Sequence, residues 1–172
     1  GVLHHCNMAF VKLTEKFNEG NFVTGFVPGG EPASCEGGVA IKIPAGSLLA
    51  LQMHFVSTGS PEKCTVSVGL RYPRDTVKQQ LRNQQITDRR FAIPAGAPAH
   101  KVSKTYTLDR DVVGAALFSH MHLRGKACSY EALTPDGKTE TILDIPRYDF
   151  NWQTTYELAE PRTLPKGTRL AR

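Results

Sequence analysis

Two histidines separated by one residue, His120 and His122, are the feature of this sequence that points most directly to chemistry. They end an apolar run, and the pattern predicts a β-strand over 113–122. Alternate residues of a strand share a face, so the two imidazoles would start about 6.6 Å apart, close enough to converge on one ion. Neutral imidazole is a common ligand for zinc, copper and iron. The pair therefore predicts a metal site, and its spacing does not choose between zinc and copper.

Three more histidines lie near the start of the chain, as the pair His4-His5 and as His54. Adjacent residues of a strand point to opposite faces, so His4 and His5 can share an ion only where the strand bulges. His54 lies on a predicted strand over 48–56, on the face opposite Leu49, Leu51, Met53 and Phe55. The face with these four apolar residues is expected to be the core face. Each of these histidines is also explained by a purely structural role. His100 follows a proline-containing turn and is expected at the surface.

The composition predicts an all-β protein. The 172 residues include 15 Gly and 11 Pro, and short apolar runs are bounded by turn residues throughout. The net charge of +5 comes from scattered basic residues without interleaved aromatics, which argues against nucleic-acid binding. No apolar run is long enough for a transmembrane segment. We found no nucleophile elbow, P-loop, dinucleotide fingerprint or H-E-x-x-H motif.

We expect two tandem antiparallel β-sandwich domains of jelly-roll type, over 1–78 and 79–172. Both ends of the chain are abrupt, so we expect a fragment of a longer protein, with both domains partial and the first and last strands incomplete. Ile-Pro-Ala-Gly occurs at 43–46 and 93–96, which suggests two similar units. A polar linker is predicted over 73–85, with a short helix over 75–82. The other predicted strands cover 38–43, 64–72, 101–108, 128–133 and 140–145, with a hairpin turn at 134–138.

Four cysteines occur without C-x-x-C spacing, which argues against a zinc ribbon or a thioredoxin-type motif. Cys35 and Cys64 lie in polar surroundings and are the best candidates for a disulfide. Cys6 and Cys128 lie in strand-like runs and are expected to be buried. Dispersed cysteines fit disulfides in an oxidising compartment, and four free thiols fit the pattern nearly as well.

An ordered series of short motifs runs along the chain from His4-His5 to His120-Met121-His122-Leu123-Arg124-Gly125-Lys126. Between them lie Val27-Pro28-Gly29, Ile43-Pro44-Ala45-Gly46, Leu51-Gln52-Met53-His54-Phe55, Cys64-Thr65-Val66-Ser67-Val68 and Ile93-Pro94-Ala95-Gly96. In order and spacing the series resembles the type II, ascorbate-dependent copper monooxygenases, the family of peptidylglycine α-hydroxylating monooxygenase and dopamine β-monooxygenase. The chain looks closest to bacterial members of that family.

The resemblance implies two β-sandwich domains with one copper on each. It assigns His4, His5 and His54 to the copper that supplies electrons, and His120 and His122 to the copper that activates O₂. Ascorbate would serve as reductant for hydroxylation of a small substrate, in the periplasm or outside the cell.

Two departures from the family pattern bear on activity. The family's methionine ligand to the second copper would follow Arg172, and neither Met8 nor Met53 matches it by motif. Phe118 stands where the peptide hydroxylase has a carboxylate-binding arginine, so peptide amidation is not expected. The alternative is therefore a non-catalytic β-sandwich subunit of a larger complex, or a chain that works with additional domains. A third reading is a copper or zinc carrier without redox turnover.

Overall fold

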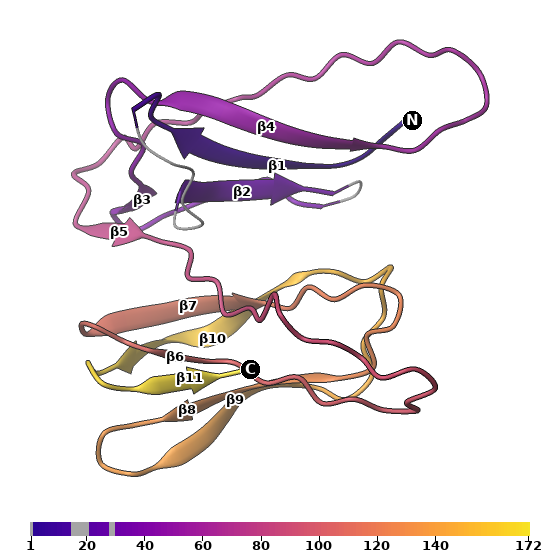
Figure 1. The fold of residues 1–172 in the computed structure, drawn as a ribbon. Helices are drawn as coiled ribbons and strands as arrows, with labels where there is room; N and C mark the ends of the chain where they lie inside the picture. The colour runs from indigo at the N-terminus through magenta and orange to yellow at the C-terminus, as the bar shows by residue number, and fades with distance from the viewer. Residues whose placement is uncertain (1, 15–20, 28–29) are drawn as a thin grey trace. The chain divides into compact units, whose positions relative to one another are not determined.

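The protein is all-β, as predicted, and its computed structural model describes residues 2–14, 21–27 and 30–172 (Figure 1). Within these residues there are eleven strands and no α-helix. Pro28 and Gly29 of the motif series lie outside the described residues. The chain divides into two compact units, Gly1–Gln85 and Ile86–Arg172. Each unit is described by itself.

The first unit contains a three-stranded antiparallel sheet of order β2-β1-β4. Its strands are β1 (Leu3–Val11), β2 (Phe22–Phe26) and β4 (Leu48–Phe55). Cys6, Met8 and Ala9 of β1 are buried together with Val23 of β2, so β1 supplies most of the buried apolar surface of this unit. β1 is the central strand of this sheet, so the backbone groups along both of its edges are paired.

A second, two-stranded sheet of this unit pairs β3 (Val39–Ile41) with β5 (Gln79–Leu81). The pairing is parallel, whereas the other six strand pairings are antiparallel as expected. The predicted helix over 75–82 is therefore wrong, since β5 occupies part of that segment. Because β5 pairs with β3, the division between the units falls after Gln85 and not at residue 78.

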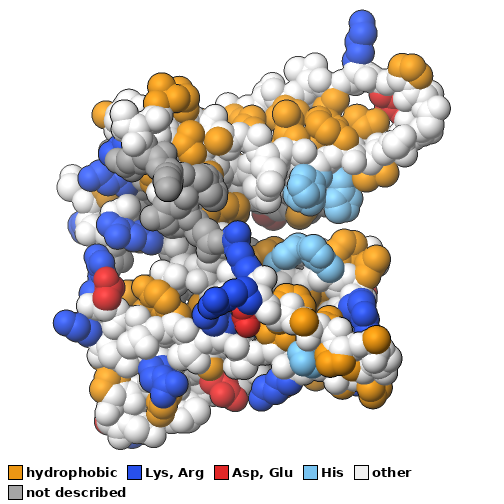
Figure 2. All heavy atoms as spheres, in the orientation of Figure 1, with side chains coloured by type: hydrophobic (Ala, Val, Ile, Leu, Met, Phe, Trp, Pro, Cys, Tyr) orange, Lys and Arg blue, Asp and Glu red, His pale blue; other side chains and the backbone are white. Residues whose placement is uncertain are grey.

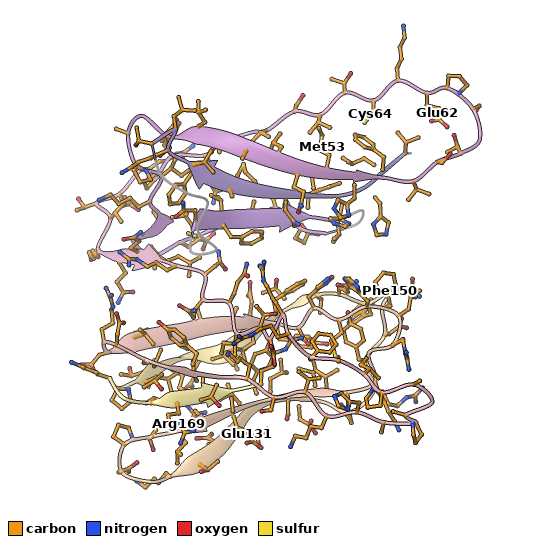
Figure 3. The ribbon with its side chains drawn as sticks, viewed as in Figure 1. Met53, Glu62, Cys64, Glu131, Phe150 and Arg169 are labelled. Atoms are coloured by element: carbon orange, nitrogen blue, oxygen red, sulfur yellow. The ribbon has the colours of Figure 1, made fainter. Side chains whose placement is uncertain are left out.

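The predicted strand over 64–72 is also wrong. Its alternating apolar residues Val68, Leu70 and Tyr72 are exposed, and the segment from Ser57 to Lys78 contains no strand. Figure 3 shows this segment running past Cys64 as an extended connection. An apolar alternation becomes a strand only where a second strand satisfies its backbone, and the described residues offer this segment no such partner.

The second unit contains a four-stranded sheet of order β6-β11-β8-β9 and a two-stranded sheet of β10 and β7. The bounds are β6 Thr105–Thr107, β7 Val112–Phe118, β8 Cys128–Leu133, β9 Thr139–Ile145, β10 Thr155–Leu164 and β11 Arg169–Ala171. Leu108, Ala132 and Leu164 form its buried core. Tyr106, Val112, Ile142 and Leu170 pack against that core. The sheets thus share one apolar centre within this unit.

The two Ile-Pro-Ala-Gly segments form the same turn, one in each unit. Ser47 N donates to Pro44 O at 3.2 Å, and Ala97 N donates to Pro94 O at 3.2 Å. Gly46 and Gly96 have φ values of 74° and 72°, the left-handed conformation that the third position of a type II turn requires. The repeat is therefore a repeated turn, as its sequence suggested.

All four cysteines are free thiols in this structure. Cys6 is buried as expected, Cys128 is half-buried on β8, and Cys64 is exposed. The Cys35–Cys64 disulfide stays a prediction. Across the described parts of the chain, no helix has the length and apolar character needed to span a membrane.

Candidate metal centres

A β-bulge brings His4 and His5 together at the start of β1. In the pairing of β1 with β4, Leu3 lies opposite Phe55 and His5 lies opposite His54, so His4 is the additional residue. A bulge of this kind removes the strict alternation of side chains, which is the condition that two adjacent ligands require. The Nδ1 atoms of His4 and His5 lie 2.9 Å apart.

His54 joins this pair across the sheet. Its ring centroid lies 4.0 Å from that of His5, with an interplanar angle of 46°, and the His4 and His5 centroids are 5.1 Å apart. Asn7 and Gln52, the next pair on the same face, hydrogen-bond at 3.1 Å. This face of the sheet is therefore polar and carries three imidazoles at one end.

The three imidazoles are close together, but no group of three or more His, Cys, Asp or Glu side chains in the described chain forms a ready metal site. His5 and His54 contact each other with tilted rings. Ligands to one ion direct their nitrogens toward it, so binding would require at least one of these rings to turn. His54 is exposed, so its ring can turn without disturbing the buried side chains of β1.

The second histidine pair also comes together, but not on a strand. β7 ends at Phe118, so the predicted strand over 113–122 is too long, and His120 and His122 follow it in a loop. The Nε2 atoms of His120 and His122 nonetheless lie 3.1 Å apart. Histidine side chains are visible on the surface of each unit in Figure 2.

A tight turn and one tyrosine hold this loop. Gly125 N donates to His122 O at 2.8 Å, which closes the turn. The backbone N–H of Met121 donates to the Tyr148 hydroxyl at 3.0 Å, and that hydroxyl donates to Met121 O at 2.6 Å. A Cβ on Gly125 would lie 2.7 Å from Met121 Cβ and 2.8 Å from Tyr148 Cδ1. Any side chain at this position would therefore force Met121 or Tyr148 to shift.

Arg172 and Tyr130 fix the beginning of the loop. Arg172 Nη2 donates to His120 O at 2.7 Å and to Ser119 Oγ at 3.3 Å. The Tyr130 hydroxyl donates to Phe118 O at 2.8 Å, and the Arg172 guanidinium lies 5.8 Å from the Tyr130 ring centroid. Burial raises the pKa of Tyr130, and the Arg172 charge partly opposes that shift. Tyr130 is therefore a protonated donor at neutral pH.

Gln153 contacts the ring of His120 directly. Gln153 Oε1 lies 2.5 Å from His120 Nδ1, and Gln153 Nε2 donates to Phe150 O at 2.8 Å. Phe150 lies in the loop between β9 and β10 (Figure 3). The sequence alone did not single out Gln153, Tyr148, Tyr130 or Arg172, because each acts from more than seven residues away along the chain. Gly125, three residues after His122, was a local signal of the turn at 122–125.

Both histidine pairs fit a metal ion by donor chemistry and by distance. Two nitrogens that lie 2.0–2.1 Å from one ion are about 2.9 Å apart at a right angle and about 3.3 Å apart at a tetrahedral angle. The observed separations of 2.9 Å and 3.1 Å fall within this range. The same separations are also ordinary hydrogen-bond distances between ring nitrogens. Imidazole suits zinc, copper, iron and nickel, so the donors of both pairs are compatible with any of these metals.

Comparisons with models of protein families, with curated proteins and with solved structures found no match for this chain.

Proposed function

We propose that this chain is a copper-binding protein of the ascorbate-dependent monooxygenase type, working in the periplasm or outside the cell. The observation that supports this best is the pairing of histidines within each unit. In each pair the ring nitrogens approach each other, at 2.9 Å for His4 and His5 and at 3.1 Å for His120 and His122. These histidines occupy positions in the motif series that resembles the copper monooxygenases.

Different residues of the chain would form the two copper sites. In the first, His4 and His5 present Nδ1 atoms from the β-bulge, and His54 completes the set when its ring turns. In the second, His120 and His122 present Nε2 atoms from a loop fixed by Tyr148, Tyr130 and Arg172. Bound copper would supply one-electron redox chemistry and oxygen activation. Ascorbate would supply two electrons and two protons, so that one oxygen atom enters a substrate C–H bond and the other leaves as water.

The surroundings of the second pair favour an apolar substrate group over a carboxylate. Leu123 directly follows His122, Trp152 directly precedes Gln153, and Phe118 lies two residues before His120. The exposed fractions of Phe118, Leu123 and Trp152 are 47%, 82% and 69%. A phenyl ring at position 118 cannot form the charge-assisted bond by which an arginine holds a carboxylate. We therefore do not assign peptide amidation to this chain.

Copper loading followed by electron paramagnetic resonance tests the proposal. The wild type is expected to show two Cu(II) signals with nitrogen hyperfine structure. His120→Ala should remove one of them, and His100→Ala, which changes an exposed histidine outside both groups, should remove neither. Ascorbate-dependent oxygen consumption should be lost in His122→Ala. A wild type with no nitrogen-coordinated copper would refute the proposal.

A non-catalytic subunit of a larger complex is the second candidate function, and the surface of β4 favours it. Leu49, Met53 and Phe55 share the face of β4 that was expected to be the core face, but their exposed fractions are 38%, 40% and 56%. Figure 3 marks Met53 on this strand. Exposed apolar residues in such a row are typical of surfaces that contact another chain. A folded wild type that binds no copper would favour this function.

A further inference from the structure

We propose that Gln153 is a positioning residue that keeps His120 in the tautomer with the proton on Nδ1. Nε2 of His120 is then the metal-binding nitrogen. The metal in this inference rests on the proposed function, whereas the choice of tautomer rests on hydrogen bonds within the chain alone.

The donor and the acceptor in each hydrogen bond can be assigned, because a carbonyl oxygen can only accept. The Phe150 carbonyl can only accept, so the Gln153 atom 2.8 Å from it must be the amide nitrogen. The other end of the amide is then Oε1, which can only accept as well, and it lies 2.5 Å from His120 Nδ1. Nδ1 must therefore carry the hydrogen.

A proton on Nδ1 of His120 determines the state of the other ring nitrogen, Nε2. A neutral imidazole carries one N–H, so a proton on Nδ1 leaves a lone pair on Nε2. That atom lies 3.1 Å from Nε2 of His122. Metal-bound histidines commonly donate their other N–H to a carbonyl, carboxylate or water, and this contact fixes the ring orientation and the basicity of the ligand.

The fold holds Gln153 against His120, although the two residues are far apart in the sequence. It lies 33 residues after His120, between Phe150 and the start of β10. Its backbone follows the Asp149–Trp152 turn, in which Trp152 N donates to Asp149 O at 3.0 Å. The side chain is half-buried, which limits competition from water for its two hydrogen bonds.

Nitrogen-15 imidazole spectra of the metal-free full chain at neutral pH provide the direct test. Wild-type His120 should show the Nδ1–H tautomer. Gln153→Leu, which removes the acceptor, should shift His120 toward the Nε2–H tautomer, and Gln153→Glu should restore Nδ1–H. Asn151→Leu, an exposed residue of the same loop, is the matched control and should leave the tautomer unchanged. A wild-type His120 with the proton on Nε2 would overturn the proposal, even if Gln153→Leu does not fold.

A copper titration separates this proposal from the proposed function. Gln153→Leu should weaken copper binding at the second site about 10- to 100-fold, and Gln153→Glu should not weaken it. Equal copper affinity in Gln153→Leu and the wild type would overturn the role of Gln153 in metal binding. If the tautomer changes as expected but the wild type binds no copper, the positioning role stands and the copper function fails.

Discussion

Replacing Gly125 by alanine tests whether the loop that carries His120 and His122 is held as described. The new Cβ would lie 2.7 Å from Met121 Cβ and 2.8 Å from Tyr148 Cδ1, whereas ordinary contacts begin at 3.4 Å. The nearer contact must therefore open by at least 0.7 Å. Met121 Cβ moves only with its backbone, and that backbone carries both hydrogen bonds to Tyr148.

The expected cost combines three effects. Overpacking costs about 1–3 kcal/mol. Weakening the two hydrogen bonds of Tyr148 adds up to about 1 kcal/mol for each. The lower entropy of unfolded alanine offsets about 0.4–1 kcal/mol of this loss. We expect a net destabilisation of about 2 kcal/mol, together with weaker copper binding at the second site and an unchanged first site.

Urea unfolding of the full chain, followed by a copper titration, measures both effects. Gly114→Ala is the matched control in the same unit, because its nearest contacts lie at 3.7 Å and it should change stability by no more than about 0.5 kcal/mol. Equal stability of Gly125→Ala and Gly114→Ala would refute the described packing of the loop. A destabilised Gly125→Ala that binds the second copper normally would refute the link from Tyr148 to the histidines.

Three further predictions concern the second unit. Leu164→Ala removes a core side chain that is 5% exposed and should cost about 2–5 kcal/mol in denaturant unfolding; a loss below 1 kcal/mol would contradict the assigned core. Thr168→Val should leave stability unchanged or raise it by about 1 kcal/mol, because the buried hydroxyl has no hydrogen-bond partner in the described chain. A loss of stability would show that the Thr168 hydroxyl does form a hydrogen bond. The Thr134 hydroxyl, and then Lys138, lower the pKa of Asp136 from 3.8 to about 2, so its carboxyl carbon should titrate near pH 2 by NMR. The small stability that its ionisation provides is complete above pH 4 and is lost as the pH falls through 2, and a midpoint near 4 would exclude these contacts.

Local signals predicted the β8–β9 hairpin almost to the residue. The turn around Gly137, with φ of 86°, is closed by Thr134 N donating to Lys138 O at 2.9 Å. All of its determinants lie within five residues, and such signals are readable from sequence. The repeated turns at Gly46 and Gly96 were predictable for the same reason.

Strand β10 escaped prediction because Pro161 lies within it. Proline cannot donate to a β-ladder and normally argues against a strand. Here the pairing with β7 is interrupted between Glu157 and Arg162, so no ladder bond is required at Pro161. This irregularity depends on the pairing with β7, so the sequence around Pro161 does not indicate it.

The prediction that His120 and His122 lie together was confirmed, but the predicted strand that was expected to align them was wrong. The residue types of the pair predicted that the rings meet, but the strand that was to align them ends at Phe118. Tertiary contacts align them instead, through Tyr148 and Gln153, which are 26 or more residues away in sequence. Contacts of this range cannot be read from the spacing of the histidines.

A competitive copper titration of the purified full chain tests the central claim most directly. We expect two copper ions per chain for the wild type and for His100→Ala, and one for each of His54→Ala and His120→Ala. Fewer than one copper ion bound to the folded wild type, or the same amount in all four proteins, would contradict the assignment of these histidines to two copper sites.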